Sequence, residues 1–138
     1  MTNLLLIIPN LGFGGAQKIF REQLRFYAAH FNVIGCVFNK DHFIDVDKQL
    51  SLISLDVPAG KNLFGKVIYL ILRPWRLRAL MKKYAVAVTI SHLEGADYIN
   101  ILSGRKEKKI GWVHGTKKFD NEIRGALGWL RRKILIPL

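Results

Sequence analysis

The sequence predicts an α/β fold: a doubly wound, mostly parallel sheet with helices on both faces. Short runs of mostly apolar residues, such as residues 4–8 and 85–90, suggest strands that are covered on both sides, which is typical of parallel sheets. Between them lie longer stretches with apolar residues at helical spacing. A hydrophobic content of 50% in 138 residues is enough for one folded domain with a real core.

Residues 4–30 predict the first strand, a turn and the first helix. The apolar run 4–8 is followed by a turn that contains Gly12, Gly14 and Gly15, and residues 16–30 have helical spacing of apolar side chains. Glycines leave the turn without side-chain bulk, so backbone N–H groups can approach a ligand closely. The start of the helix offers free N–H donors and a positive dipole end, which suits a phosphate.

The glycine turn does not match either common nucleotide motif. The dinucleotide fingerprint needs a third glycine or alanine at position 17, where this chain has Gln17, and no Walker-type phosphate loop occurs. A turn that serves only to connect strand and helix therefore stays open as an alternative. We favour a ligand phosphate, because three glycines in four residues exceed what a turn needs.

Two further strands are predicted at residues 31–38 and 52–57. Asp41 stands roughly where a site for NAD would need an acid, but this adds little once the glycine pattern has failed. Cys36 is the chain's one cysteine and lies in an apolar run, so it cannot form an internal disulfide. We expect a buried structural thiol and a reducing compartment.

Residues 61–84 predict a long basic and apolar helix. Its apolar residues cover two adjoining faces, wider than one contact with a sheet requires. Pro74 predicts a kink, or a restart with proline in the first turn. A basic amphipathic segment with Phe and Trp is typical of an interfacial membrane helix, so we expect residues 61–83 to bind an anionic membrane surface. A crossover helix packed on the sheet is equally compatible. The basic residues of this segment are Lys61, Lys66, Arg73, Arg76, Arg78, Lys82 and Lys83.

Charge is divided unevenly along the chain. Residues 1–60 hold five basic and five acidic residues, whereas residues 61–138 hold seventeen basic and five acidic ones, which accounts for the whole net charge of +12. A basic half implies an anionic partner: a nucleic acid, an anionic membrane or a phosphorylated substrate. Nucleic acid is disfavoured, because the basic residues are spread over helices without a recognition motif or an aromatic stacking set.

The second half of the chain predicts two more strands with polar exits. Ser91 and Glu94 follow the apolar run 85–90, and ligands of open α/β sheets bind outside the carboxyl ends of strands. An equally compatible interpretation is that Ser91 and Glu94 form a capping box for a helix over about 96–102. Residues 109–116 predict the last strand with its polar exit. His114 stands where this strand ends, beside a glycine, and its imidazole can bond a sugar or a phosphate there. A final helix is expected over 119–138.

Several classes of site and location are disfavoured by the sequence. The four histidines lie at positions 30, 42, 92 and 114, without metal-ligand spacing, and no Ser-His-acid set is readable as a local motif. The opening apolar run is short and lacks a charged lead, which argues against a signal peptide. The longest later apolar run is too short for a membrane span. We expect a cytoplasmic protein without a metal or other cofactor.

Three motifs together resemble a known family. Residues 4–17 (LLLIIPNLGFGGAQ), 89–95 (TISHLEG) and 109–115 (KIGWVHG) are similar to the amino-terminal, Rossmann-like domain of family 4 glycosyltransferases. These are retaining enzymes of the two-domain GT-B architecture. The resemblance covers nearly the whole chain, and the three motifs come in the family's order. The resemblance implies transfer of a hexose from a nucleoside-diphosphate sugar to a surface-polysaccharide or lipid-linked acceptor.

The resemblance also implies roles for single residues. Gly14 and Gly15 match the family's loop that approaches the donor diphosphate, and His114 matches a histidine that contacts the transferred sugar. Gln17 stands where many members have Glu and can face the acceptor, and Ser91 and Glu94 would lie near the acceptor as well. The family's amino-terminal domain often lies on the membrane, which implies a peripheral location on the inner membrane face.

The chain departs from the family in its length. A GT-B enzyme needs a second domain that binds the nucleotide sugar, and the family's Arg/Lys pair and its Glu-x7-Glu element lie there. We therefore expect residues 1–138 to be a single, incomplete domain: a truncated product, an isolated domain, or half of a split enzyme whose donor domain is a separate chain. Alone it would be inactive. The alternative is a non-catalytic basic module that associates with membrane or nucleic acid.

Overall fold

The computed structural model describes residues 1–39, 51–57, 63–104 and 106–114. Within these ranges eight elements follow one another along the chain. They are β1 (Asn3–Ile8), α1 (Gly15–Ala28), β2 (Asn32–Val37), β3 (Leu52–Ser54), α2 (Leu63–Lys83), β4 (Val88–His92), α3 (Glu94–Leu102) and β5 (Lys108–Trp112). Asp41 and the helix expected over 119–138 lie outside the described residues.

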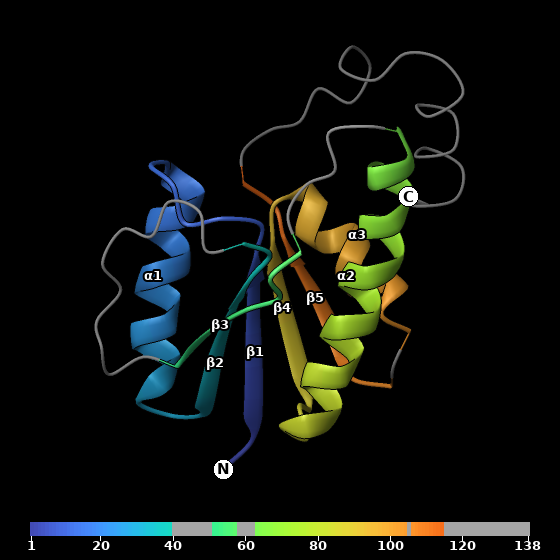
Figure 1. The fold of residues 1–138 in the computed structure, drawn as a ribbon. Coiled ribbons are helices and arrows are strands. Elements are labelled where there is room, and N and C mark those ends of the chain that lie inside the picture. Colours follow the sequence, from blue (N-terminus) through green and yellow to red (C-terminus); the bar gives the residue numbers. More distant parts are fainter. Residues whose placement is uncertain (40–50, 58–62, 105, 115–138) are drawn as a thin grey trace.

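The described strands form one parallel sheet in the order β3-β2-β1-β4-β5. The strand β1 lies in the centre, pairing Ile7 with Cys36 of β2 on one side and with Ser91 of β4 on the other. Figure 1 shows α1 on one face of this sheet and α2 and α3 on the other. The predicted doubly wound α/β fold, mostly parallel with helices on both faces, is confirmed.

Alternation along β1 divides the core into two layers, because successive side chains of a strand point to opposite faces. Leu4, Leu6 and Ile8 pack with Phe20 and Leu24 of α1. The other side of the sheet packs against α2 and α3. That second layer includes Leu5, Ile7, Leu77, Met81, Ala96 and Ile99. The continuous apolar run of β1 is thus explained by burial on both faces.

Most predicted elements are present, with shifted ends. The fourth strand begins at Val88 rather than at residue 85, because Ala85 takes a left-handed conformation (φ 47°) that belongs to the preceding turn. The strand continues to His92, two residues beyond the predicted end. The helix α1 packs through Phe20 and Leu24, while Phe26 on the same helix is 66% exposed. Pro74 starts no new helix, since it lies inside the continuous α2.

Two arginines of α2 bond the segment that follows β3. Arg73 is buried, and its Nε and Nη2 donate to the carbonyl of Val57 at 3.0 and 2.8 Å. Arg76 Nη1 donates to the carbonyls of Leu55 and Asp56. The prediction of an outward basic face is wrong for Arg73, which is buried, whereas Arg76 stays exposed while it bonds the segment after β3.

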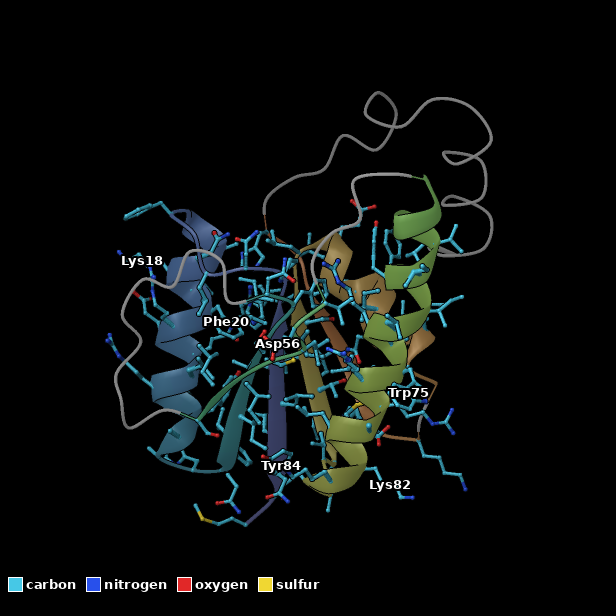
Figure 2. All side chains as sticks on the ribbon, in the orientation of Figure 1. Lys18, Phe20, Asp56, Trp75, Lys82 and Tyr84 are labelled. Atoms are coloured by element: carbon cyan, nitrogen blue, oxygen red, sulfur yellow. The ribbon has the colours of Figure 1, made fainter. Side chains whose placement is uncertain are left out.

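The remaining outer surface of α2 is apolar between Val67 and Trp75. Its exposed apolar side chains are Val67, Ile68, Leu70, Ile71, Leu72 and Trp75. Figure 2 shows Trp75 and Lys82 on this helix, with Trp75 nearer its middle and Lys82 near its end. The predicted wide apolar stripe is therefore divided. Leu77 and Met81 pack on the sheet, whereas the apolar side chains exposed between Val67 and Trp75 face solvent.

Two further expectations can be compared with the structure. Cys36 is fully buried, and burial raises the pKa of its thiol to about 12, as expected for an unreactive structural cysteine. Among the described residues, no helix combines the length and apolar character that crossing a membrane requires.

Candidate functional site

The carboxyl edge of the sheet gathers the predicted site residues. Parallel strands end at the same edge, the upper one in Figure 1, so the turns after β1, β4 and β5 lie there together. The neighbours of β1 are β2 and β4, and chain order reverses between β1 and β4. Such a reversal is where doubly wound sheets leave a crevice for ligands.

The glycine turn is held by its own polar side chains. Asn10 Oδ1 accepts from the backbone N–H of Gly12 and from Nε2 of Gln17, both at 3.3 Å. Gly14 is the N-cap residue of α1 and provides no side-chain cap, and the first helical turn holds no acidic residue. The helix therefore begins with a positive dipole end that no side chain of its first turn neutralises.

Gly14 and Gly15 differ in their surroundings. A Cβ atom at Gly14 would collide with Oε1 of Gln17, so that glycine makes room for the Gln17 side chain. A Cβ at Gly15 would meet no atom within 4 Å, so packing within the chain does not require a glycine there. The space beside Gly15 is open to a ligand.

His114 meets a second histidine at this edge. Its Nε2 lies 3.0 Å from Nδ1 of His92, the last residue of β4. The His92 ring is fully buried, with Phe20 of α1 edge-on at 5.4 Å and Trp112 of β5 stacked at 6.2 Å. Three elements therefore fix the ring that contacts His114.

Both imidazoles favour the neutral form. Burial lowers the pKa of His92 from 6.5 to about 4, and the neighbouring His114 lowers it further. Burial also lowers the pKa of His114, although the carboxylate of Asp97 opposes this change. At neutral pH the pair can share a hydrogen bond without charge repulsion.

Ser91 lies on the opposite face of β4, in a buried polar network. Its Oγ donates to Oδ1 of Asp97 at 2.7 Å and accepts from Nδ2 of Asn100 at 3.3 Å. The predicted capping box is wrong, because Ser91 belongs to β4 and the N-cap of α3 is Leu93, at φ 72° and without a side-chain cap bond. Ser91 organises the strand–helix contact instead.

Glu94 begins α3 and accepts a hydrogen bond from the hydroxyl of Tyr98 one turn later. The first turn of α3 lies close to the first loop, since a Cβ at Gly95 would lie 3.7 Å from Cγ of Pro9. Glu94 is therefore on the same edge as the glycine turn. Its predicted place near an acceptor stays a prediction, as do the places of Gln17 and Ser91.

Sequence reasoning missed His92 and Asp97. In the sequence, His92 is one of four histidines without metal-ligand spacing, which indicates no role for it. A helix that begins at about residue 96 likewise gives no reason to place Asp97 at the site. The signal was available in the alternation of β4: Ile90 and His92 face α1, while Thr89 and Ser91 face α3. Among the described residues, no group of three or more His, Cys, Asp or Glu could hold a metal ion.

Comparison with known proteins supports the architecture. No protein-family model and no curated protein matches the chain. A solved structure of the apo form of the lipopolysaccharide outer core galactosyltransferase WaaB is similar to it, with a TM-score of 0.58 and 13% sequence identity. The chain has a glycosyltransferase-like fold. The match covers 81% of this chain and 33% of that one, so the chain spans about a third of the neighbour's length.

Proposed function

We propose that this chain is the amino-terminal, acceptor-side domain of a family 4 type retaining glycosyltransferase of the GT-B architecture. The complete enzyme would transfer a hexose from a nucleoside-diphosphate sugar to a surface-polysaccharide or lipid-linked acceptor. The donor-binding domain would come from a longer form of the same protein or from a separate chain, and residues 1–138 alone would be inactive. In this proposal no metal takes part.

One observation carries the proposal: the open space at Gly15 and the imidazole of His114 share the carboxyl edge of the sheet at a reversal of chain order. The start of α1 suits the donor diphosphate, because its first turn holds no acidic residue and its dipole is positive there. His114 would contact the transferred sugar. Gln17 and Glu94, in the first turns of α1 and α3, would face the acceptor.

The decisive experiment is transfer by the complete enzyme. The native polypeptide is first sized by immunoblot in its source cell, and a product of about 300 residues or more, the length of two ordinary domains, identifies a longer form. That protein, or the chain with a co-purified partner, is assayed with a panel of nucleotide sugars. Transfer that falls about 100-fold or more in His114→Ala supports the assignment. Transfer that is unchanged in this variant contradicts it.

Membrane association is the second part of the proposal. The open apolar surface of α2 continues onto Leu102 of α3, and a groove of about 290 Å³ lies between the two helices. Arg78, Lys82 and Lys83 are exposed on the same helix. Apolar side chains flanked by cations match the interface of an anionic bilayer, on the inner face of the membrane.

Vesicle binding tests this part. Vesicles containing phosphatidylglycerol should retain the chain, whereas vesicles of phosphatidylcholine should retain less. Replacing Lys82 and Lys83 by Gln should weaken retention, at about 1 kcal/mol for each charge, and Trp75→Ser should weaken it through lost apolar burial. Equal retention of all variants would remove the membrane proposal. Retention on nucleic acid that falls steeply with salt would favour the alternative, a nucleic-acid module.

A further inference from the structure

One ring nitrogen of His92 is buried without a hydrogen-bond partner in the described part of the chain. His92 is fully buried, its Nδ1 faces Nε2 of His114 at 3.0 Å, and its own Nε2 has no hydrogen-bond partner among the described residues. In a neutral imidazole one nitrogen carries the proton and the other accepts. The pair therefore has two possible arrangements, which differ in what is left at the buried Nε2.

The two arrangements are not equal in free energy. If His92 carries its proton on Nε2, a buried N–H donor remains unpaired, which is rare in native structures. If the proton is on Nδ1, His92 donates to His114, and only an acceptor lone pair stays unfilled at Nε2. Unfilled acceptors are tolerated more readily than orphaned donors. The second arrangement is therefore favoured.

We infer that His92 is a positioning residue: its Nδ1–H donates to Nε2 of His114 and so fixes the His114 ring with its proton on Nδ1. His114 then offers an N–H donor from Nδ1 and has no free acceptor nitrogen. Such a ring donates a hydrogen bond to an oxygen of the ligand, a sugar hydroxyl or an anionic oxygen, and does not act as a base. Its part in transfer rests on the proposed function.

His92 acts through His114 rather than on a ligand. Its ring has no exposed surface, so a ligand cannot reach Nε2 without opening the contact between α1 and the sheet. Phe20 and Trp112 hold the ring from two sides. The lowered pKa of His92 is consistent with this arrangement, since a neutral ring is needed for the lone pair at Nε2.

Nitrogen NMR of the 138-residue chain tests the inference without any substrate. Long-range proton–nitrogen spectra at pH 7 distinguish protonated from unprotonated ring nitrogens. We expect both His92 and His114 to carry the proton on Nδ1. A proton on Nε2 of His114 overturns the inference, and this measurement needs no variant to fold.

Two substitutions of His92 separate its hydrogen bond from its packing. His92→Phe keeps a ring between Phe20 and Trp112 but removes the donor, so His114 should populate both tautomers. His92→Asn places an amide N–H near the position of Nδ1 and should restore the single tautomer. His30→Asn is the matched control, because His30 is exposed at the end of α1. Identical His114 spectra in the wild type and both His92 variants overturn the inference.

The complete enzyme supplies the functional readout. His92→Phe should lower kcat about 10-fold or more with little change in KM for the donor, and His92→Asn should recover most of that loss. An unchanged kcat in an enzyme that transfers sugar contradicts the positioning role. If no nucleotide sugar is used at all, the proposed function fails, and the NMR result still decides the histidine pair.

Discussion

The five residues of β4 point alternately to two faces of the sheet, and the two faces have opposite environments. Toward α1, Ile90 and His92 lie among apolar and aromatic side chains, and His92 keeps one nitrogen without a partner in the described structure. Toward α3, Thr89 and Ser91 join a polar network with Asn100, in which each side chain has a partner. On the first face one imidazole nitrogen has no partner in the described structure, whereas on the second Thr89, Ser91 and Asn100 bond one another or their neighbours.

The largest expected effect comes from removing the aromatic ring that covers His92. Phe20→Ala should cost about 3–5 kcal/mol in the free energy of unfolding, because Phe20 is fully buried and leaves a cavity. Phe26→Ala, on the same helix but 66% exposed, should cost less than about 1 kcal/mol. Urea titration measures both. Similar losses in the two variants would contradict the core assigned to α1.

Acid should weaken the α1 face through His92. Its pKa is about 4 in the folded chain against 6.5 ordinarily, so the unfolded chain binds more protons between these values. Stability contributed by His92 is complete above pH 6.5 and is lost as the pH falls towards 4, by about 2–3 kcal/mol. His114 titrates beside it with the same sign, and Asp97 opposes that shift.

The difference between the wild type and His92→Phe isolates this contribution. The variant has no titrating group at position 92, so its stability should decline less between pH 6.5 and 4. Thermal or urea unfolding at several pH values supplies the comparison. Parallel stability curves for the two proteins would show that His92 is not buried in its neutral form.

The polar face should respond to loss of its central amide. Asn100 accepts from Thr89 Oγ1 at 3.0 Å and from Lys109 Nζ at 3.2 Å, besides donating to Ser91. Asn100→Ala should cost about 2 kcal/mol, because buried polar partners lose hydrogen bonds. Ile101→Ala, next in α3 and half exposed, is the control and should cost less than about 1 kcal/mol. Equal costs would contradict the network.

The smallest effect on stability concerns the glycine turn that leads into α1. Gly15→Ala should leave stability unchanged or raise it by up to about 1 kcal/mol, because alanine favours the helix and its Cβ meets no atom within 4 Å. Gly14→Ala must displace Gln17. In the complete enzyme Gly15→Ala should nevertheless weaken binding of the donor nucleotide sugar. Unchanged donor affinity would move the diphosphate away from this turn.

The fold was predictable because its signals are local and repeated. Apolar runs such as residues 4–8 reveal strands buried on both faces, and the glycine turn marks the entry into α1. The predicted sites of Gly14, Gly15 and His114 do share one edge of the sheet, which follows from parallel strands. Their roles in binding and transfer remain predictions.

What could not be predicted depends on element ends and long-range contacts. With a strand ending at Ile90, His92 falls in a loop; with β4 extended to His92, alternation turns its ring towards α1. Beginning α3 at Glu94 likewise places Asp97 one turn inside the helix, where it reaches Ser91. The sequence could not predict the burial of Arg73, because a side-chain bond to the distant carbonyl of Val57 leaves no pattern in the sequence.

The central position of β1 has a consequence for synthesis. This strand is made before the other described elements, yet it needs β2 and then β4, about 80 residues later, before both of its edges are paired. At about 5–20 residues per second on a ribosome, an apolar strand edge waits roughly 4–16 s for its second partner. During that interval the nascent chain exposes a row of unpaired backbone amides, together with five side chains that are buried in the folded chain. Chaperones bind segments of this kind.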